Sequence, residues 1–351
     1  MSGSSVRLEP RYLITTLRRR LRERRNGHFW SCRRVLPSPN SVVRHAHRVR
    51  FLRMPATRNS LPATPATLVV GAGRLGIAMA AGLREAGWPV VLVARGNASA
   101  ARAAACGLAF VRSLGDAPAA GLVLLCVPDD AVSNAALALC DHPHLLSTSA
   151  VVLHTSGAVP VAALVALDAL VAGTGSLHPL QTVTVHSSAG VLHGAPAAVS
   201  GDAIAIAMSE RMCEALGLVP FRLADEMKPL HHAASAVAAN FTVALLDVSI
   251  RLAVEAGMPT EAARSAFAAL ARSAVDRVAD QPTEEALTGP IVRGDVGTVR
   301  AHLAALRRSA PEFLPLYIEA ARCTLRLARR AGLDADAART IAAALDDPVP
   351  S

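Results

Sequence analysis

The amino-acid sequence predicts a doubly wound parallel α/β sheet followed by an all-α domain, and three observations indicate this fold class. From residue 67 to about residue 178, short apolar runs rich in β-branched residues alternate with alanine-rich stretches of helical character, which is the pattern of a parallel sheet with crossover helices. A glycine-rich turn at residues 71–76 joins the first run to the first stretch. From residue 225 to 347 the pattern is helical, without a strand candidate. A chain of 351 residues is long enough for two such domains.

The first domain is expected over residues 66–224 and the second, helical domain over residues 225–347. The expected strands of the main sheet, in chain order, are residues 68–70, 89–94, 121–127, 150–154 and 174–178. Two short β-like pieces at residues 190–193 and 197–201 are expected to extend the sheet, before a helix over residues 203–216 and a strand over residues 219–223. Such sheets bind ligands outside the carboxyl ends of their strands. The residues at these ends are Gly71, Arg95, 127–129, 154–157 and 178–179.

The turn after the first strand has the spacing G-x-G-x-x-G, with glycines at 71, 73 and 76. In a strand–turn–helix unit, Gly71 permits the tight turn, Gly73 lets the backbone approach a phosphate, and Gly76 lets the helix pack on the strand. The helix N-terminus then offers free N–H groups and a positive dipole end to the anion. We therefore predict a dinucleotide site here, the alternative being a glycine-rich turn without a ligand. The expected cofactor-binding residues are Gly71, Gly73, Arg74, Leu75, Gly76, Arg95, Val127, Pro128, Thr155 and Ser156.

The end of the second strand bears on the choice between NADP(H) and NAD(H). Enzymes that use NAD usually carry an acidic residue there, which accepts from the ribose 2′-hydroxyl. This chain has Arg95 at that position, followed by Asn97, Ser99 and Arg102, and no carboxylate nearby. A guanidinium can bind a 2′-phosphate, so NADP(H) is favoured over NAD(H). The alternative is an arginine on a solvated loop.

The positive charge of the chain is confined to its first residues. The formal net charge is +9, but residues 1–65 hold 15 arginines and two acidic residues, so the remaining 286 residues are mildly acidic. The leader has no sustained apolar period and is expected to be disordered. Three origins stay open: upstream sequence before a true start at Met54, which we favour, a transit peptide, or a basic arm for nucleic acid.

Composition argues against several other classes. The six cysteines form no C-x-x-C pair and, without a recognisable signal peptide, indicate reduced thiols in a cytoplasmic protein. No His, Cys and carboxylate cluster has zinc spacing, so no metal is expected. The uncharged stretch 142–167 is interrupted by Ser, Thr, Gly and Pro and is not a membrane span. Aromatic residues make up 3% of the chain, too few for base-stacking platforms, so nucleic-acid binding is not expected.

Lysine usage singles out one position. Lys228 is the only lysine among 36 basic residues. A lysine that survives in an arginine-rich chain suggests a position that arginine cannot fill, because only lysine has a pKa that shifts readily and can act as an acid or base. Lys228 lies at the expected start of the first helix of the second domain. Chance survival on the surface is the alternative. His232 and Asn240 lie eight residues apart on the same expected helix, about 80° apart around its axis, and can face one cleft.

Four motifs resemble one known family. They are His154-Thr-Ser-Gly157, Ser176-Leu-His-Pro-Leu-Gln-Thr182, Lys228-Pro-Leu-His-His-Ala-Ala234 with Asn240, and Leu287-Thr-Gly-Pro-Ile291 with Arg293-Gly-Asp295. Together they resemble a bacterial family of Rossmann-like proteins, described as oxidoreductases, with a C-terminal domain of unknown function (2520 type). That family is similar to the 6-phosphogluconate dehydrogenase-like group. The resemblance implies a Rossmann-like domain, an all-α 6-phosphogluconate dehydrogenase C-terminal-like domain, and a homodimer formed through the helical domain.

The resemblance also implies roles for individual residues. Lys228 and Asn240 match the Lys and Asn that contact the reacting oxygen in hydroxyacid and ketopantoate members. His178, before Pro179, resembles the histidine beside the nicotinamide in prephenate dehydrogenases. Each motif also has a structural alternative: His154 can end a strand, Thr155-Ser156-Gly157 can turn the chain, and Arg293 can pair with Asp295 rather than hold a substrate carboxylate.

Two function classes follow from these observations. The first is an NADP(H)-dependent oxidoreductase that moves hydride to or from a small carbonyl, imine or hydroxy-acid substrate in an interdomain cleft. The second is a non-catalytic NADP(H)-binding sensor or partner protein on the same fold. The lysine and the polar strand ends favour the enzyme. The expected catalytic residues are Lys228, His178, His232 and Asn240.

Overall fold

The computed structural model describes residues 64–184 and 189–347. All of these described residues belong to one compact unit. The predicted leader, apart from its last two residues, and the proposed start at Met54 lie outside the described residues. The predicted domain boundary at residues 224–225 lies within this unit, where strands give way to helices, and the division into two domains stays a prediction.

The described residues form one eight-stranded sheet in the order β3-β2-β1-β4-β5-β6-β7-β8. Strands β3 to β6 in this order are mutually parallel, β7 runs antiparallel to β6, and β8 runs parallel to β7. The sheet order reverses direction at β1, between β2 and β4, which is where ligands bind in doubly wound sheets. The strands are β1 (Thr67–Val70), β2 (Val90–Val93), β3 (Ala109–Val111), β4 (Ala120–Leu125), β5 (Leu146–His154), β6 (Gly173–Pro179), β7 (Pro196–Gly201) and β8 (Val219–Arg222).

The predicted α/β fold class is confirmed, with three local differences. Strand β3 was not predicted, because its three residues are too short to show a period. The predicted β piece at residues 190–193 is wrong: the short 3₁₀ helix η5 (Ala189–Leu192) stands there. The sheet is not wholly parallel, since a parallel connection needs a crossover of a dozen or more residues, usually helical. Between β6 and β7 the described residues contain only η5, and β7 accordingly returns antiparallel.

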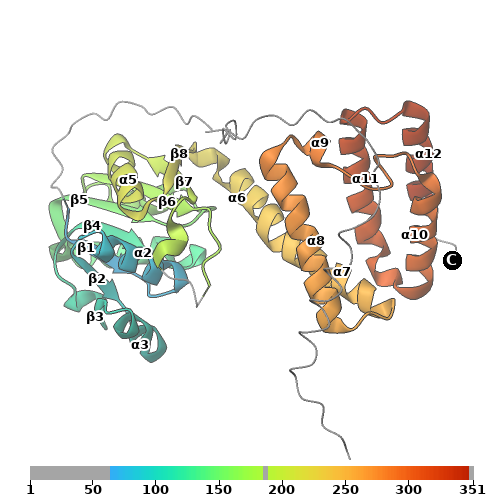
Figure 1. Ribbon diagram of the computed structural model, residues 1–351. Helices are drawn as coiled ribbons and strands as arrows, with labels where there is room; N and C mark the ends of the chain where they lie inside the picture. The colour runs from blue at the N-terminus through green and yellow to red at the C-terminus, as the bar shows by residue number, and fades with distance from the viewer. Residues whose placement is uncertain (1–63, 185–188, 348–351) are drawn as a thin grey trace, which may run out of the picture. The chain divides into compact units, whose positions relative to one another are not determined.

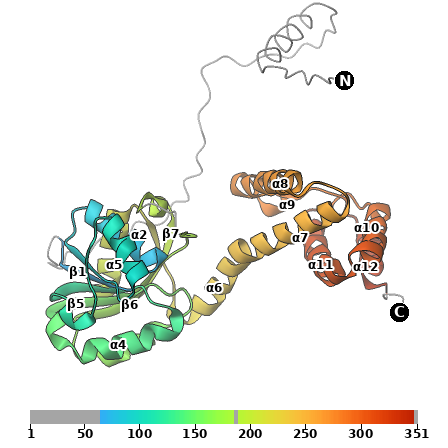
Figure 2. The same cartoon turned by 90° about the horizontal axis from the view of Figure 1, so that it is seen from below.

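Helices cover both faces of the sheet (Figures 1 and 2). Helices α2 (Arg74–Glu85), α3 (Asn97–Ala105) and α5 (Ala203–Leu216) bury apolar side chains in the core on one face. Helix α4 (Val132–Cys140) and the 3₁₀ helix η4 (Val161–Leu167) do so on the other. Successive strand residues alternate between these cores, as Leu68 and Val69 do.

The residues after β8 are helical, as predicted. The short 3₁₀ helix η6 (Asp225–Met227), helix α6 (Lys228–Ala236), a π-helical turn η7 (Val237–Phe241) and α7 (Thr242–Glu255) follow one another directly. A third core lies mainly among α10, α11 and α12. The remaining helices are α8 (Thr260–Asp280), α9 (Thr283–Ala286), α10 (Val296–Ser309), η8 (Pro311–Phe313), α11 (Leu314–Arg330) and α12 (Ala335–Asp346).

One helical stretch in the described part of the chain is exposed and apolar. Residues Asp225–Glu255 form a helical stretch that is long and apolar enough to span a membrane by length and composition. The most apolar part of this stretch has a mean hydropathy of 1.6, and only 6% of that part is buried. Valine and leucine side chains on α7 and on the neighbouring α8, and Phe241 at the end of η7, are also exposed. No element within residues 64–184 and 189–347 covers these side chains.

Candidate functional site

The glycine turn between β1 and α2 has the geometry of a phosphate cradle. Gly71 has φ +110°, and a Cβ there would lie 2.3 Å from the Cys126 carbonyl oxygen at the end of β4. A Cβ on Gly76 would lie 2.0 Å from the Gly71 carbonyl oxygen. In contrast, a Cβ on Gly73 would meet nothing within 4 Å. Gly71 and Gly76 are therefore required by packing, whereas Gly73 faces open space.

Helix α2 begins directly at this open space. Its N-cap, Gly73, makes no side-chain capping bond, and its first turn, which includes Arg74 and Leu75, contains no acidic residue. The first N–H groups of a helix have no intrahelical partner and favour an anion. The residues at this turn therefore fit a dinucleotide pyrophosphate. Val127 lies against Gly71, and Pro128 begins the turn that follows β4, so both stand beside the cradle.

A second group of basic side chains lies at the ends of β2 and β3. Arg95 follows β2 and is exposed. Arg112 follows β3, and its guanidinium donates to the Asn97 side-chain oxygen (3.1 Å) and to the Arg95 carbonyl oxygen (3.5 Å). Arg102, on α3, reaches the Ala72 carbonyl oxygen at 3.4 Å. Arg112 thus holds the loop that follows β2 in place, and Arg102 joins α3 to the glycine turn.

Lys228 is buried, although it is the first residue of an otherwise exposed helix. Its side chain is 2% exposed. The Nζ atom donates to the Ser176 hydroxyl oxygen at 2.8 Å and lies 3.9 Å from Asp225 Oδ1. Burial lowers the pKa of Lys228 from 10.5 to about 8, against the opposing effect of Asp225 and Asp129. A lysine in this state is mostly charged at neutral pH and close to releasing its proton, as a general acid requires.

The histidines of two strands line the same face of the sheet as Ser176. His154 ends β5 and is the register partner of Ser176 on β6, and His178 follows Ser176 by two residues. Because side chains two apart on a strand share a face, His154, Ser176 and His178 lie together. His154 is 0% exposed, and neither ring nitrogen reaches a partner in hydrogen-bond geometry. Burial and the Lys228 charge lower the pKa of His154 to about 3, so it is neutral.

His178 and His232 approach each other across a glycine. Their ring centroids are 6.0 Å apart, and His178 Nδ1 lies 2.9 Å from the Thr155 carbonyl oxygen. A Cβ on Gly157 would lie 2.6 Å from His178 Nε2 and 2.8 Å from His232 Nδ1. Burial lowers the pKa of His178, and the neighbouring histidines and Lys228 add to this effect. The structure thus gathers three of the four predicted catalytic residues, Lys228, His178 and His232, around β6.

The fourth, Asn240, lies elsewhere. It belongs to the π-helical turn η7 and is exposed. The expected rotation of about 80° holds for a continuous α-helix. A π turn has wider spacing, so the rotation between His232 and Asn240 differs from the expected 80°. The structure gives no contact between Asn240 and the Lys228 group.

Several other predicted residues have structural partners. The Ser156 hydroxyl accepts from the Ala158 and Val159 N–H groups and so turns the chain after β5. The Thr155 N–H donates to the Leu125 carbonyl. Asp295 caps α10 through the Thr298 N–H at 2.9 Å, while Arg293 is exposed. In the described ranges, no group of three or more His, Cys, Asp or Glu is placed to hold a metal ion.

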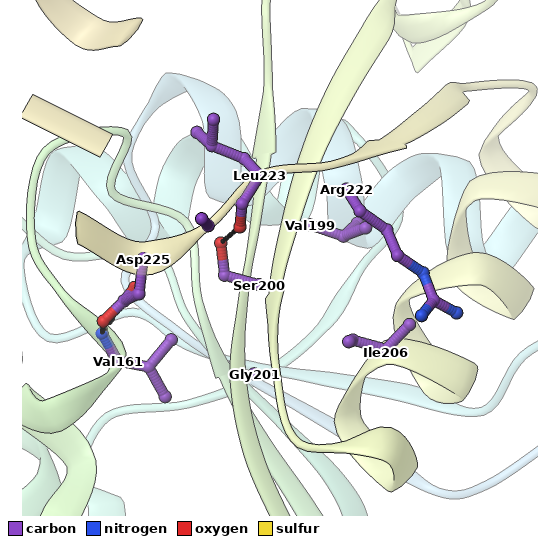
Figure 3. Close-up of a pocket in the computed structure, with 9 residues that line it drawn as sticks. Val161, Val199, Ser200, Gly201, Ile206, Arg222, Leu223 and Asp225 are labelled. Carbon is purple, nitrogen blue, oxygen red and sulfur yellow. Dashed lines mark hydrogen bonds between the residues drawn. The ribbon is translucent and has the colours of Figure 1, made fainter. Parts of the chain in front are cut away.

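An open pocket of about 430 Å³ lies beside Asp225. Figure 3 shows Asp225 directed at the backbone nitrogen of Val161, and Ser200 at the Leu223 carbonyl. The distances are 2.8 and 3.0 Å from the Val161 nitrogen to the two Asp225 oxygens, and 2.6 Å from Ser200 Oγ to the Leu223 oxygen. Asp225 therefore stands between this pocket and buried Lys228.

Three residues of the site were not among the predicted contacts. Ser176 was quoted in a motif, but nothing in the sequence pairs it with Lys228, which is 52 residues away. Asp225 was read only as the start of the helical region, although its i,i+3 spacing to Lys228 could have indicated an ion pair. Arg112 belongs to the unpredicted strand end of β3.

Part of the chain matches a known family model. Residues 195–324 match the family described as "Domain of unknown function (DUF2520)". A search of curated proteins finds no match. Among solved structures, a candidate NADP oxidoreductase from Bacteroides fragilis is similar at 20% identity and TM-score 0.59, covering 76% of this chain and 98% of that one.

Two further solved structures have a similar fold. A protein from Thermotoga maritima is 22% identical with TM-score 0.60, covering 75% of this chain and 98% of that one. A pyrroline-5-carboxylate reductase from Coxiella burnetii is 14% identical with TM-score 0.50, covering 76% of this chain and 98% of that one. At these identities the likeness concerns the fold alone. The chain therefore has a Rossmann-like fold followed by a helical region, and its residues 195–324 match the DUF2520 model, in agreement with the resemblance of the sequence motifs.

Proposed function

We propose that the protein is an NADP(H)-dependent oxidoreductase that acts on a small carbonyl, imine or hydroxy-acid substrate. One observation carries this proposal: the only lysine of the chain is buried beside Ser176, on a strand of the same sheet that carries the open glycine cradle. A buried lysine costs stability, so its presence suggests a chemical role. The described activities of the B. fragilis and C. burnetii proteins support the same reaction class.

The residues of this chain divide the work as follows. The α2 N-terminus and Gly73 hold the cofactor pyrophosphate, and Arg95 with Arg112 binds the 2′-phosphate. When bound, the nicotinamide supplies or accepts the hydride. Lys228 Nζ gives a proton to the substrate oxygen or nitrogen in reduction and takes it back in oxidation. His178 and His232 orient the substrate against this group. We place the substrate where α6 meets the carboxyl ends of the strands, the expected interdomain cleft.

The test starts with binding and continues with turnover. Fluorescence titration should give tighter binding of NADPH than of NADH, by about tenfold or more, as expected for one charge-assisted phosphate contact. Turnover is then screened with 2-keto acids, cyclic imines and hydroxy acids. Lys228→Arg should lower the rate by about 10²–10⁴, the usual effect of losing a general acid, with NADPH binding unchanged. Arg264→Lys, in an exposed ion pair of α8, is the matched control and should leave the rate unchanged.

The alternative is a sensor that binds NADP(H) without catalysis. It is favoured if NADPH binds and no substrate class gives turnover. Near-normal activity of Lys228→Arg on an accepted substrate contradicts lysine chemistry and makes His178 or His232 the acid.

We also propose that the protein is a homodimer formed through α7 and α8. Phe241 and Val243 on the apolar stretch are 56% and 68% exposed, and Leu270 and Val275 on α8 are 63% and 60% exposed. Helix α8 packs along α7 and also carries charged side chains, including the Glu261–Arg264 pair. A mixed apolar and charged surface is typical of protein interfaces rather than of lipid contact. A second copy presents the same surface and closes it symmetrically.

Sedimentation velocity tests the dimer. The protein should sediment as a dimer, and Val243→Asp should shift it towards monomer. Leu137→Asp, at an exposed leucine on α4, should not. A monomeric protein, or one that floats with lipid vesicles, contradicts the proposal, and the latter result makes the stretch a membrane contact.

A further inference from the structure

Lys228 is held from two sides by residues of different elements. Ser176 accepts its hydrogen bond from within the sheet. Asp225, three residues earlier in the chain, has its Oδ1 atom 3.9 Å from Nζ. The Lys228 and Ser176 side chains are buried, whereas Asp225 is 32% exposed. The ammonium group thus has a buried hydroxyl as one partner and a solvent-accessible carboxylate as the other.

Asp225 is itself fixed in place. Both of its oxygens accept from the Val161 N–H at the start of η4, at 2.8 and 3.0 Å (Figure 3). The carboxylate therefore cannot turn away from Lys228 without losing these bonds. An uncharged asparagine at position 225 could also accept a hydrogen bond from the Val161 N–H and fill the same space. The negative charge of Asp225 is not needed for either role.

The groups that face Lys228 explain why a charge is needed. The sheet presents the imidazoles of His154 and His178, whose pKa values are lowered mainly by burial, so both are neutral at pH 7 and supply no counter-charge. Asp129, after β4, is the other acidic group that acts on Lys228. Burial lowers the pKa of Lys228, and Asp225 is the largest influence that opposes this decrease. Without Asp225, the ammonium would be less stable at neutral pH.

We propose that Asp225 and Ser176 are positioning residues that hold the Lys228 ammonium in a fixed, charged state for proton donation. Asp225 supplies the charge that keeps the proton on Nζ, and Ser176 fixes the direction of the N–H group within the sheet. The proposal about the charged state rests on the geometry. Its catalytic meaning rests on the proposed function.

The single lysine makes this proposal testable without a substrate. Protein grown with ¹³Cε-labelled lysine gives one lysine Cε signal, whose chemical shift followed against pH reports the pKa of Lys228. Asp225→Asn should lower this pKa by about one unit, the low end for a partly solvated opposite charge. Ser176→Ala should also lower it, because the ammonium loses its acceptor. Asp202→Asn is the matched control: Asp202 also accepts from backbone N–H groups and is not among the groups that act on Lys228.

The outcomes separate this inference from the proposed function. An unchanged Lys228 pKa in folded Asp225→Asn overturns the inference, as does an equal shift in Asp202→Asn. If Asp225→Asn fails to fold, Asp225→Glu and Ser176→Ala decide: a wild-type pKa in the first and a lowered one in the second support the inference, and no change in Ser176→Ala overturns it. Loss of turnover in Lys228→Arg belongs to the proposed function and is measured separately.

Discussion

Replacing Lys228 by methionine should stabilise the fold at neutral pH while removing the proposed proton donor. Burial lowers the pKa of Lys228 from 10.5 to about 8, a difference of about 2.5 units, and each unit corresponds to about 1.36 kcal/mol. Keeping this lysine charged in the native state therefore costs about 3 kcal/mol. Methionine has a similar length and no charge, but the variant loses the hydrogen bond that Lys228 donates to Ser176, which costs about 1 kcal/mol. The expected net stabilisation at pH 7 is about 2 kcal/mol.

The pH dependence gives this prediction its sign. Between pH 8 and 10.5 the native state binds fewer protons at Lys228 than the unfolded chain does, so the stability of the wild-type protein rises with pH in this window. The advantage of Lys228→Met should therefore shrink from pH 8 upwards and reach zero at about pH 9.5. Above about pH 10.5 the variant should be less stable by about 1 kcal/mol, the value of the lost hydrogen bond. Urea unfolding of both proteins at several pH values from 7 to 10.5 measures it. A variant that is less stable at pH 7, or a difference that does not change with pH, would refute the reasoning.

Four further predictions concern the other residues of the site. His154→Gln should make the free energy of unfolding less dependent on pH below about 6.5. In the wild-type protein His154 stays neutral in the native state, so its free energy of unfolding falls by about 1.4 kcal/mol per pH unit as the pH falls from 6.5 towards 3. Urea unfolding of both proteins at pH 4 to 7 tests this, and the same pH dependence in both would contradict it. Gly73→Ala should keep the melting temperature of the wild-type protein but weaken NADPH binding at least tenfold, because its Cβ meets no protein atom and fills the cradle. Gly76→Ala is the contrasting variant and should lower the melting temperature, because its Cβ would strike the Gly71 carbonyl. Unimpaired NADPH binding in Gly73→Ala would exclude a phosphate cradle at this turn. Arg112→Gln should weaken NADPH binding by about tenfold and leave NADH binding unchanged. Arg84→Gln is the control in the same titration and should leave both unchanged, because the Arg84 side chain donates to the Cys106 and Gly107 carbonyls, away from the cradle. Gly157→Ala should displace His178 and His232 and destabilise the protein by about 1–3 kcal/mol, the usual cost of overpacking; thermal unfolding and histidine NMR signals measure both effects, and unshifted signals would show that the space is larger than the geometry indicates.

Much of the fold followed from local patterns. The alternation of apolar runs and alanine-rich stretches predicted the positions of five parallel strands of the sheet, and the helix at Ala203–Leu216 was predicted with its observed bounds. That helix has an Asp202 N-cap and a left-handed Gly217 at its end, which are strong sequence signals. Strand β3 and the antiparallel direction of β7 were missed, because a three-residue strand has no period and strand direction depends on the path of the connection.

The sequence by itself determined the turn and the unusual lysine, since both depend on residue type and spacing. The spacing of Gly71, Gly73 and Gly76 indicated a phosphate site, and the absence of any other lysine singled out Lys228. Only the tertiary structure decided what surrounds them. Ser176 meets Lys228 because β6 and the start of α6 pack together, and His154 joins them through the strand register. Contacts between residues far apart in the chain depend on packing and register, which no local pattern records. Asn240, which the spacing had paired with His232, lies exposed in a π-helical turn.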